Sequence, residues 1–157
     1  MAAILRSWRM YAGVLLLAVA LVVADPAARP AMAAACSGTS GVTVVVDYGA
    51  LGGGVVVACD PTDPATGIAA LQGAGFTVTG TRRYGLAFVC RINGKPNATQ
   101  DPCVNTPPAT AYWSYWHASR HGTWAFSTLG ATSYNPAPNT VEGWAYGAGT
   151  KPHISPP

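Results

Sequence analysis

The sequence predicts a single small α+β domain that is stapled by disulfide bonds, and three observations support this. Short stretches rich in valine, threonine and aromatic residues alternate with glycine- and proline-rich turns, as in β-rich extracellular domains. Only residues 65–75, ATGIAALQGAG, carry apolar residues at helical spacing. The four cysteines form an even set. The alternative is an all-β sandwich with immunoglobulin-like strands, in which residues 65–74 would be strand or coil.

The first 35 residues match the pattern of a secretory signal peptide. A basic start precedes the apolar run Tyr11–Ala24, which is shorter than the ~20 residues of a membrane span, and small residues follow. We expect cleavage near Ala33 or Ala35 and a mature protein that is secreted or held at the cell surface. Two alternatives stay open. One is an uncleaved leader that contacts the membrane, and the other is lipidation of Cys36, because AAAC loosely matches a lipoprotein cleavage box.

The cysteines predict two disulfide bonds in an oxidising compartment, where four cysteines allow three connectivities. Strands at Val42–Gly49 and Val55–Cys59 read as a hairpin, which brings the region before Val42 towards Cys59. This pattern favours Cys36–Cys59, and Cys90–Cys103 then closes the loop INGKPNATQDP. No CxxC pair is present and the spacing does not suit zinc, so we expect no metal site.

Charge and length bound the organisation of the mature chain. From Cys36 onward, six basic and five acidic side chains leave a net charge of +1, against +3 for the whole chain. This balance gives no electrostatic basis for binding nucleic acid or an anionic membrane. We expect one domain at residues 36–148, and a disordered, proline-rich tail at residues 149–157.

The helix and the strands that follow it have recognisable ends. Thr62 or Asp63 is expected to cap the helix, and Gly73 or Gly75 to end it. Two strands follow, a half-exposed one at residues 76–82 and a second at residues 86–92, before an Asn-Gly turn. An aromatic hairpin then spans residues 112–129, and a short strand at residues 141–147 is the last element.

The aromatic hairpin carries large rings on both faces of its first strand. Alternation places Trp113, Tyr115 and His117 on one face and the neighbouring residues, including Ser114, on the other. One face can form the core, and the other then needs a cover, a partner or a ligand. We assign two of the four tryptophans from Trp113 to Trp144 to the core and expect the other two to be exposed. A two-residue turn would set His117 opposite Trp124, and a three-residue turn would shift that pairing.

Four motifs occur in a characteristic order along the mature chain. They are TGIAAL in the helix, GLAFVCRINGKP, YWSYWHA in the aromatic hairpin and VEGWAYG in the last strand. In this order they resemble the C-terminal domain of the cobalamin carriers transcobalamin and intrinsic factor, and the bacterial secreted domains related to it. The resemblance covers roughly Val42–Gly147. It implies a β-grasp-like fold of the soluble-ligand-binding group, in which a mixed sheet packs against the helix.

The resemblance also implies a ligand, which is a corrinoid such as cobalamin or another flat molecule that stacks on aromatic rings. The residues expected to bind it lie in the hairpin: Trp113, Tyr115, His117, Trp124, Ser114 and Ser127. The rings would cover one face of the ligand, the serine hydroxyls would hydrogen-bond its amide fringe, and His117 would approach the metal. We expect no other cofactor, and one domain alone should bind weakly or as half of a larger site.

The sequence favours a binding module over an enzyme. No G-x-S-x-G motif is present, and the five acidic residues of the mature chain form no evident pair. A hydrolase built on His117 and a nearby serine is a weaker candidate. The alternative from another class is a structural or protein-interaction domain of the cell envelope, which would use the aromatic surface and the tail to contact an envelope protein.

Overall fold

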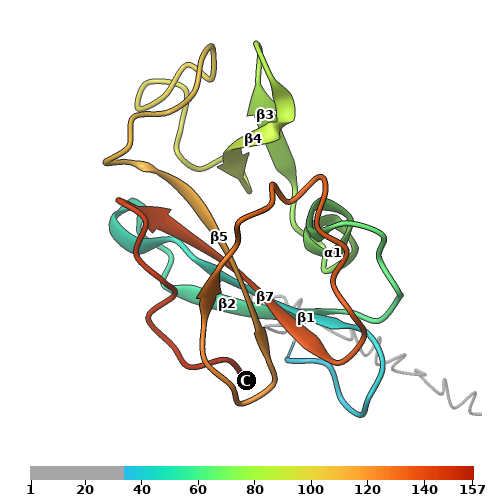
Figure 1. The fold of residues 1–157 in the computed structure, drawn as a ribbon. Coiled ribbons are helices and arrows are strands. Elements are labelled where there is room, and N and C mark those ends of the chain that lie inside the picture. The colour runs from blue at the N-terminus through green and yellow to red at the C-terminus, as the bar shows by residue number, and fades with distance from the viewer. Residues whose placement is uncertain (1–33) are drawn as a thin grey trace, which may run out of the picture.

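The computed structural model describes residues 34–157, so the predicted leader, residues 1–35, lies almost wholly outside the described residues. The elements follow one another in the order β1 (Val42–Asp47), η1 (Gly49–Leu51), β2 (Val55–Asp60), α1 (Gly67–Gly73), β3 (Val78–Thr81), β4 (Gly85–Ile92), β5 (Tyr112–Ser119), β6 (Ala125–Phe126) and β7 (Thr140–Gly147). Figure 1 shows the strands of the larger sheet crossing the body of the molecule, with α1 beside them and the β3–β4 arm projecting from one end. Within residues 34–157, no helix is long and apolar enough to span a membrane.

The larger sheet is mixed and has the strand order β2-β1-β7-β5-β6. The first and last of its long strands, β1 and β7, run parallel, whereas β1–β2, β5–β7 and β5–β6 are antiparallel. A second, two-stranded antiparallel sheet is formed by β3 and β4. The predicted α+β class with a β-grasp-like mixed sheet is confirmed, and the all-β sandwich is wrong because residues 67–73 form a helix.

Helix α1 begins one turn later than the sequence suggested. The expected caps, Thr62 and Asp63, precede it by several residues, and Thr62 instead bonds to the carboxylate of Asp60. The N-cap is Thr66, whose hydroxyl accepts a hydrogen bond from the backbone N–H of Ala69. A threonine immediately before the first helical residue satisfies an N–H that the helix itself leaves unpaired, which a more distant residue cannot do.

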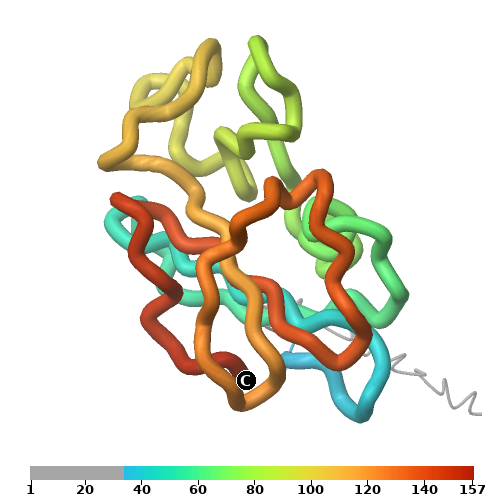
Figure 2. The backbone as a smooth tube through the Cα atoms, viewed as in Figure 1, coloured from blue at the N-terminus to red at the C-terminus, as the bar shows by residue number. Residues whose placement is uncertain are grey.

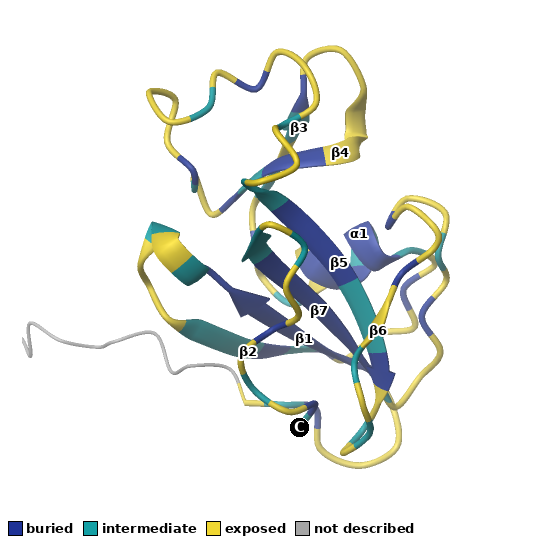
Figure 3. Ribbon diagram, turned by 60° about the vertical axis from the view of Figure 1, so that its left-hand side comes forward, coloured by how far each residue is buried: buried dark blue, intermediate teal, exposed yellow. Residues whose placement is uncertain are grey.

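One face of the larger sheet forms the main core with the helix. Its residues alternate along each strand, and they are largely apolar, as a half-buried sheet requires. Ile68 and Leu71 of α1 pack against them and against Phe76, which follows the helix. Trp113, Tyr115 and Trp144 belong to the same cluster, so the aromatic strand turns its odd-numbered side chains towards the helix. Figure 3 shows the central strands as the most buried part of the fold.

The opposite face of the sheet is covered by the C-terminal segment, which differs from the disordered tail predicted at residues 149–157. Pro152 and Pro156 are buried. The carboxylate of Asp47 accepts hydrogen bonds from the backbone N–H of His153 at 2.8 Å and from its ring Nδ1 at 2.6 Å. The indole N–H of Trp124 donates to the carbonyl of Ile154 at 2.7 Å. Composition suggested disorder, but these contacts show that the segment packs against an apolar sheet face that would otherwise be exposed. The red end of the tube in Figure 2 follows this course.

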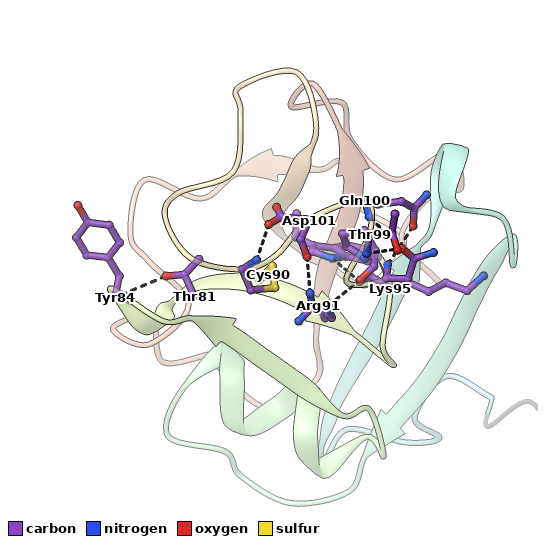
Figure 4. The surroundings of a disulfide bond; sticks show 12 residues. Thr81, Tyr84, Cys90, Arg91, Lys95, Thr99, Gln100 and Asp101 are labelled. Atoms are coloured by element: carbon purple, nitrogen blue, oxygen red, sulfur yellow. Dashed lines mark hydrogen bonds between the residues drawn. A yellow bond between two sulfur atoms is a disulfide. The ribbon is translucent and has the colours of Figure 1, made fainter.

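Both predicted disulfide bonds are confirmed. Cys36–Cys59 joins the segment before β1 to the end of β2, and Cys90–Cys103 closes the long loop after β4. The second bridge lies beside Arg91, whose guanidinium donates hydrogen bonds to the carbonyls of Pro96 and Asp101 (Figure 4). Two such bridges are common in extracellular proteins, since they persist in oxidising compartments.

Candidate functional site

A groove of about 470 Å³ lies between β4, β5 and the chain segment at residues 126–131. It is formed where the β3–β4 arm meets the edge of the larger sheet. Beside its first residues, β5 has a strand neighbour only on the β7 side, because β6 pairs with just Trp116 and His117. The volume is within the range of small-molecule sites, which are concave and lined mostly by apolar and aromatic side chains.

Exposed apolar side chains form the walls of the groove. Leu86 and Phe88 come from β4, and Phe126 and Leu129 come from the opposite segment. Phe126 and Leu129 are 51% and 53% exposed, and together with Leu86 and Phe88 they form an apolar patch of the kind that marks interaction sites. The ring of Phe126 also meets the Trp116 indole edge to face, with centroids 5.1 Å apart, so part of this wall is shared with the face of β5 that carries Trp116.

Buried aromatic rings form the floor. The rings of Trp113 and Tyr146 meet edge to face with centroids 5.4 Å apart, and the indole N–H of Trp113 donates to the carbonyl of Lys95 at 3.2 Å. The ring of Tyr115 lies tilted over Trp144 with centroids 4.8 Å apart. Trp113, Tyr115 and Trp144 all line the groove while belonging to the core, so packing beneath them fixes the floor.

The Tyr115 hydroxyl is hydrogen-bonded to a buried acid, Glu142. The Tyr115 hydroxyl donates a hydrogen bond to Oε2 of Glu142, whose side chain is completely buried. The other carboxylate oxygen of Glu142, Oε1, has no hydrogen-bond partner among the described residues. Burial raises the pKa of Glu142 to about 7, although the bond from Tyr115 lowers it in part. Burial and the neighbouring carboxylate also raise the pKa of Tyr115 far above its ordinary value.

The structure places His117 outside the groove. Its ring stacks on Tyr134, with centroids 4.5 Å apart and an interplanar angle of 1°, on the core side of β5. Burial lowers its pKa, and its Nδ1 has no partner among the described residues. In the strand register, His117 pairs with Ala125 rather than with Trp124. This register corresponds to the three-residue turn, for which a shifted pairing was expected, and not to the two-residue turn.

Trp124 is also separated from the groove. The indole lies on the opposite face of the sheet, where a Cβ at Gly143 would overlap it, and it contacts the C-terminal segment. The predicted ring set is thus divided between two faces of the sheet. A second cavity of about 620 Å³ lies there, between Trp124 and residues 150–156. It is larger than the groove, but Trp124 is the only one of the predicted binding residues that lines it.

The two predicted serines line the groove without offering free hydroxyls. The Oγ of Ser114 lies 2.9 Å from the carbonyl oxygen of Ala145 and 3.1 Å from that of Thr150, and it accepts from the Trp116 indole N–H. The Oγ of Ser127 donates to the carbonyl of Leu129 at 2.8 Å. Both hydroxyls are therefore engaged within the protein.

Of the six predicted binding residues, the structure brings together four at the groove: Trp113, Ser114, Tyr115 and Ser127. Trp113 and Trp144 are in the core, as expected for two of the four tryptophans. Trp116 and Trp124 are half-buried instead of exposed, because Trp116 packs against Phe126 and Trp124 contacts the C-terminal segment. The sequence did not point to the residues of the groove walls, Leu86, Phe88, Phe126 and Leu129, or to Glu142 behind the floor. A signal was present in the stretch GLAFV, which has apolar residues on both faces of a strand and therefore cannot bury them all against one core.

Taken together, the fold and the groove define a disulfide-bonded α+β domain with a pocket walled by exposed apolar side chains and floored by aromatic rings. Comparisons with protein-family models, with curated proteins and with solved structures find no match for this chain.

Proposed function

We propose that this chain is an exported, non-catalytic module that binds a small molecule in the groove between β4, β5 and residues 126–131. The observation that carries the proposal is the combination of a 470 Å³ hollow with exposed apolar walls and a rigid aromatic floor. Such sites bury most of a ligand's surface and gain affinity from apolar contact. The leader pattern and the two disulfides support export and an extracellular or cell-surface location.

A corrinoid such as cobalamin is the ligand that we propose to test first. The resemblance of the motifs to the carriers' C-terminal domain supports this choice, and Trp113 and Tyr115 supply ring surface at the groove floor. A corrinoid would enter without a cobalt bond from His117, because that ring is stacked beneath Tyr134. The walls of Leu86 and Phe126 would pack on the apolar part of the macrocycle.

A second candidate is a protein-interaction domain of the cell envelope. Apolar exposure continues beyond the groove onto Tyr84 and Val104, which are 42% and 37% exposed. Tyr84 contacts Phe88 with ring centroids 5.3 Å apart, so this surface is continuous with the groove wall. An extended apolar surface of this kind suits a macromolecular partner better than it suits a small ligand.

Titration with cobalamin distinguishes the two candidates. We expect a saturable change in tryptophan fluorescence and in the corrin absorption bands, because Trp113 and Trp144 lie at the groove floor. Phe126→Ala should weaken binding, whereas Val57→Ala on the distant strand β2 should not. A folded domain that shows no saturable change up to millimolar corrinoid would remove this ligand. A thermal-shift screen with haem, sugars and peptidoglycan fragments would then test the remaining small ligands.

A further inference from the structure

We propose that the groove selects uncharged, apolar, ring-containing small molecules and excludes ionised ones. This inference rests on the proposed function, since it concerns the ligand class of the same groove, and it requires that the ionised phosphodiester of a cobalamin remain in solvent outside the groove. Its basis is the chemistry of the lining residues, which come from β4, β5, β7 and the segments around residues 107 and 126–131.

No side chain that carries a charge at neutral pH is among the described residues that line the groove. Four of its polar side chains are engaged within the protein, whereas the indole N–H of Trp144 has no hydrogen-bond partner among the described residues. Ser114 and Ser127 bond to backbone carbonyls, the indole N–H of Trp113 donates to Lys95, and the hydroxyl of Tyr115 donates to Glu142. An ionised ligand group would thus leave water without a counter-charge and with few hydrogen bonds, which is unfavourable.

The carboxyl group behind the floor gives a ligand no counter-charge. Glu142 lies behind Tyr115, fully buried, and burial favours its protonated, uncharged form. Cations would gain little from it, because the rings of Tyr115 and Trp144 separate the carboxylate from the groove and Tyr115 uses its hydroxyl to bond to it.

Apolar surface is concentrated at the same place. The large apolar side chains that are exposed in residues 34–157 all lie on or beside the groove: Tyr84, Leu86, Phe88, Val104, Phe126 and Leu129. Leu86, Phe88, Phe126 and Leu129 line it, Tyr84 contacts Phe88, and Val104 accepts a backbone bond from Arg83, the neighbour of Tyr84. Hydrophobic contact is therefore the interaction that the groove can offer on every side.

A matched pair of fluorescent probes tests this selectivity. N-phenyl-1-naphthylamine is neutral, and 8-anilino-1-naphthalenesulfonate has the same phenylamino-naphthalene skeleton with an added sulfonate group. We expect the neutral probe to bind the mature domain at least about tenfold more tightly, because the sulfonate would be desolvated without a partner. Phe126→Ala should weaken binding of the neutral probe, and Val57→Ala on β2 serves as the control away from the groove.

A variant that is expected to bind more tightly completes the test, because a gain in affinity cannot be caused by partial unfolding. Leu129→Lys places a cation on an exposed part of the groove wall, where the new side chain costs little stability. We expect this variant to bind the sulfonate probe about tenfold more tightly, because the lysine supplies the missing counter-charge. Its affinity for the neutral probe should stay the same or fall.

The outcomes separate the two proposals. Equal or tighter binding of the sulfonate probe, with the Phe126→Ala effect retained, would overturn the selectivity and leave the groove as a binding site. Failure of Leu129→Lys to favour the sulfonate probe would also overturn it. If neither probe binds saturably, or if Phe126→Ala binds as the wild type does, the groove itself is not the site and the proposed function fails with it.

Discussion

Glu142 fixes the Tyr115 ring in the floor of the groove by a hydrogen bond, although its own side chain is completely buried. The side chain lies on β7, opposite His117 in the strand register, and it faces Tyr115, His117 and Tyr134. Of its two carboxylate oxygens, one accepts the Tyr115 hydroxyl and the other has no partner within residues 34–157. An acid in such surroundings is favoured in its protonated form, which can remain buried at a lower cost than the ionised form.

The raised pKa of Glu142 makes the free energy of unfolding depend on pH. The folded-state pKa of about 7 is above the ordinary value of 4.5, so the folded state binds more protons than the unfolded state between these values. The contribution is therefore fully present below pH 4.5 and is lost as the pH rises through 7. We expect a loss of about 3 kcal/mol across this window in urea denaturation.

Glu142→Gln is the matched control for this pH dependence. The amide retains an acceptor for the Tyr115 hydroxyl and does not titrate, so the variant should lose the decline above pH 4.5. His117 acts in the opposite direction, because its lowered pKa costs stability as the pH falls below 6.5. The difference between wild type and variant isolates Glu142, and parallel pH profiles would contradict the account.

At the residue scale, the sequence predicted which face of β5 is aromatic but not what each ring does. Alternation correctly placed Trp113, Tyr115 and His117 on one face. It could not show that Tyr134, which follows a loop without regular structure, would cover His117. The position of Trp124 depended on the length of one turn, and a single residue moves a side chain to the other face of a sheet.

Among the elements, helix α1 depends on its N-cap because it has only seven residues. We expect Thr66→Ala to lower the free energy of unfolding by about 1 kcal/mol, since the N–H of Ala69 would lose its acceptor. Thr66→Ser keeps the hydroxyl and should remain close to wild type in the same urea titration. An equal loss in both variants would show that the methyl group, rather than the cap, stabilises the helix.

The C-terminal segment is expected to act as a structural cover of the second sheet face. Removing residues 150–157 would expose Trp124 and the sheet beneath Pro152, and would leave Asp47 without its bonds from His153. We expect a loss on the order of 3 kcal/mol and a red-shifted tryptophan emission. Lys151→Ala, which changes an exposed residue of the same segment, should leave stability and emission unchanged. A truncated chain as stable as the full one would contradict this role.

The bridge between Cys90 and Cys103 stabilises the arm that carries one wall of the groove. It spans 13 residues of sequence, and replacing both cysteines by alanine should cost about 3 kcal/mol. Because Val89 lies next to Cys90 and lines the groove, the variant should also weaken probe binding at temperatures where it remains folded. Unchanged stability and affinity would show that the hydrogen bonds of Arg91 hold the loop without the bridge.

For the whole molecule, local patterns predicted more of the fold than of the site. The strands, the helix and both disulfides follow from valine alternation, helical spacing and hairpin geometry. The parallel pairing of β1 with β7 joins residues almost a hundred positions apart, and no pattern in the sequence predicted it; the resemblance to a family implied only that the sheet is mixed. The groove lies where the β3–β4 arm packs against the larger sheet. The sequence pattern of a single segment does not predict how two such units pack together.

We expect the groove, and not the cavity beneath the C-terminal segment, to be the ligand site. Chemical-shift mapping of the isotope-labelled mature domain, titrated with N-phenyl-1-naphthylamine and then with cobalamin, tests this most directly. We predict shifts at the backbone amides of Leu86 to Val89, Trp113 and residues 126–131. Shifts confined to residues 122–124 and 150–156, which line the other cavity, or no shifts from either molecule, would contradict it.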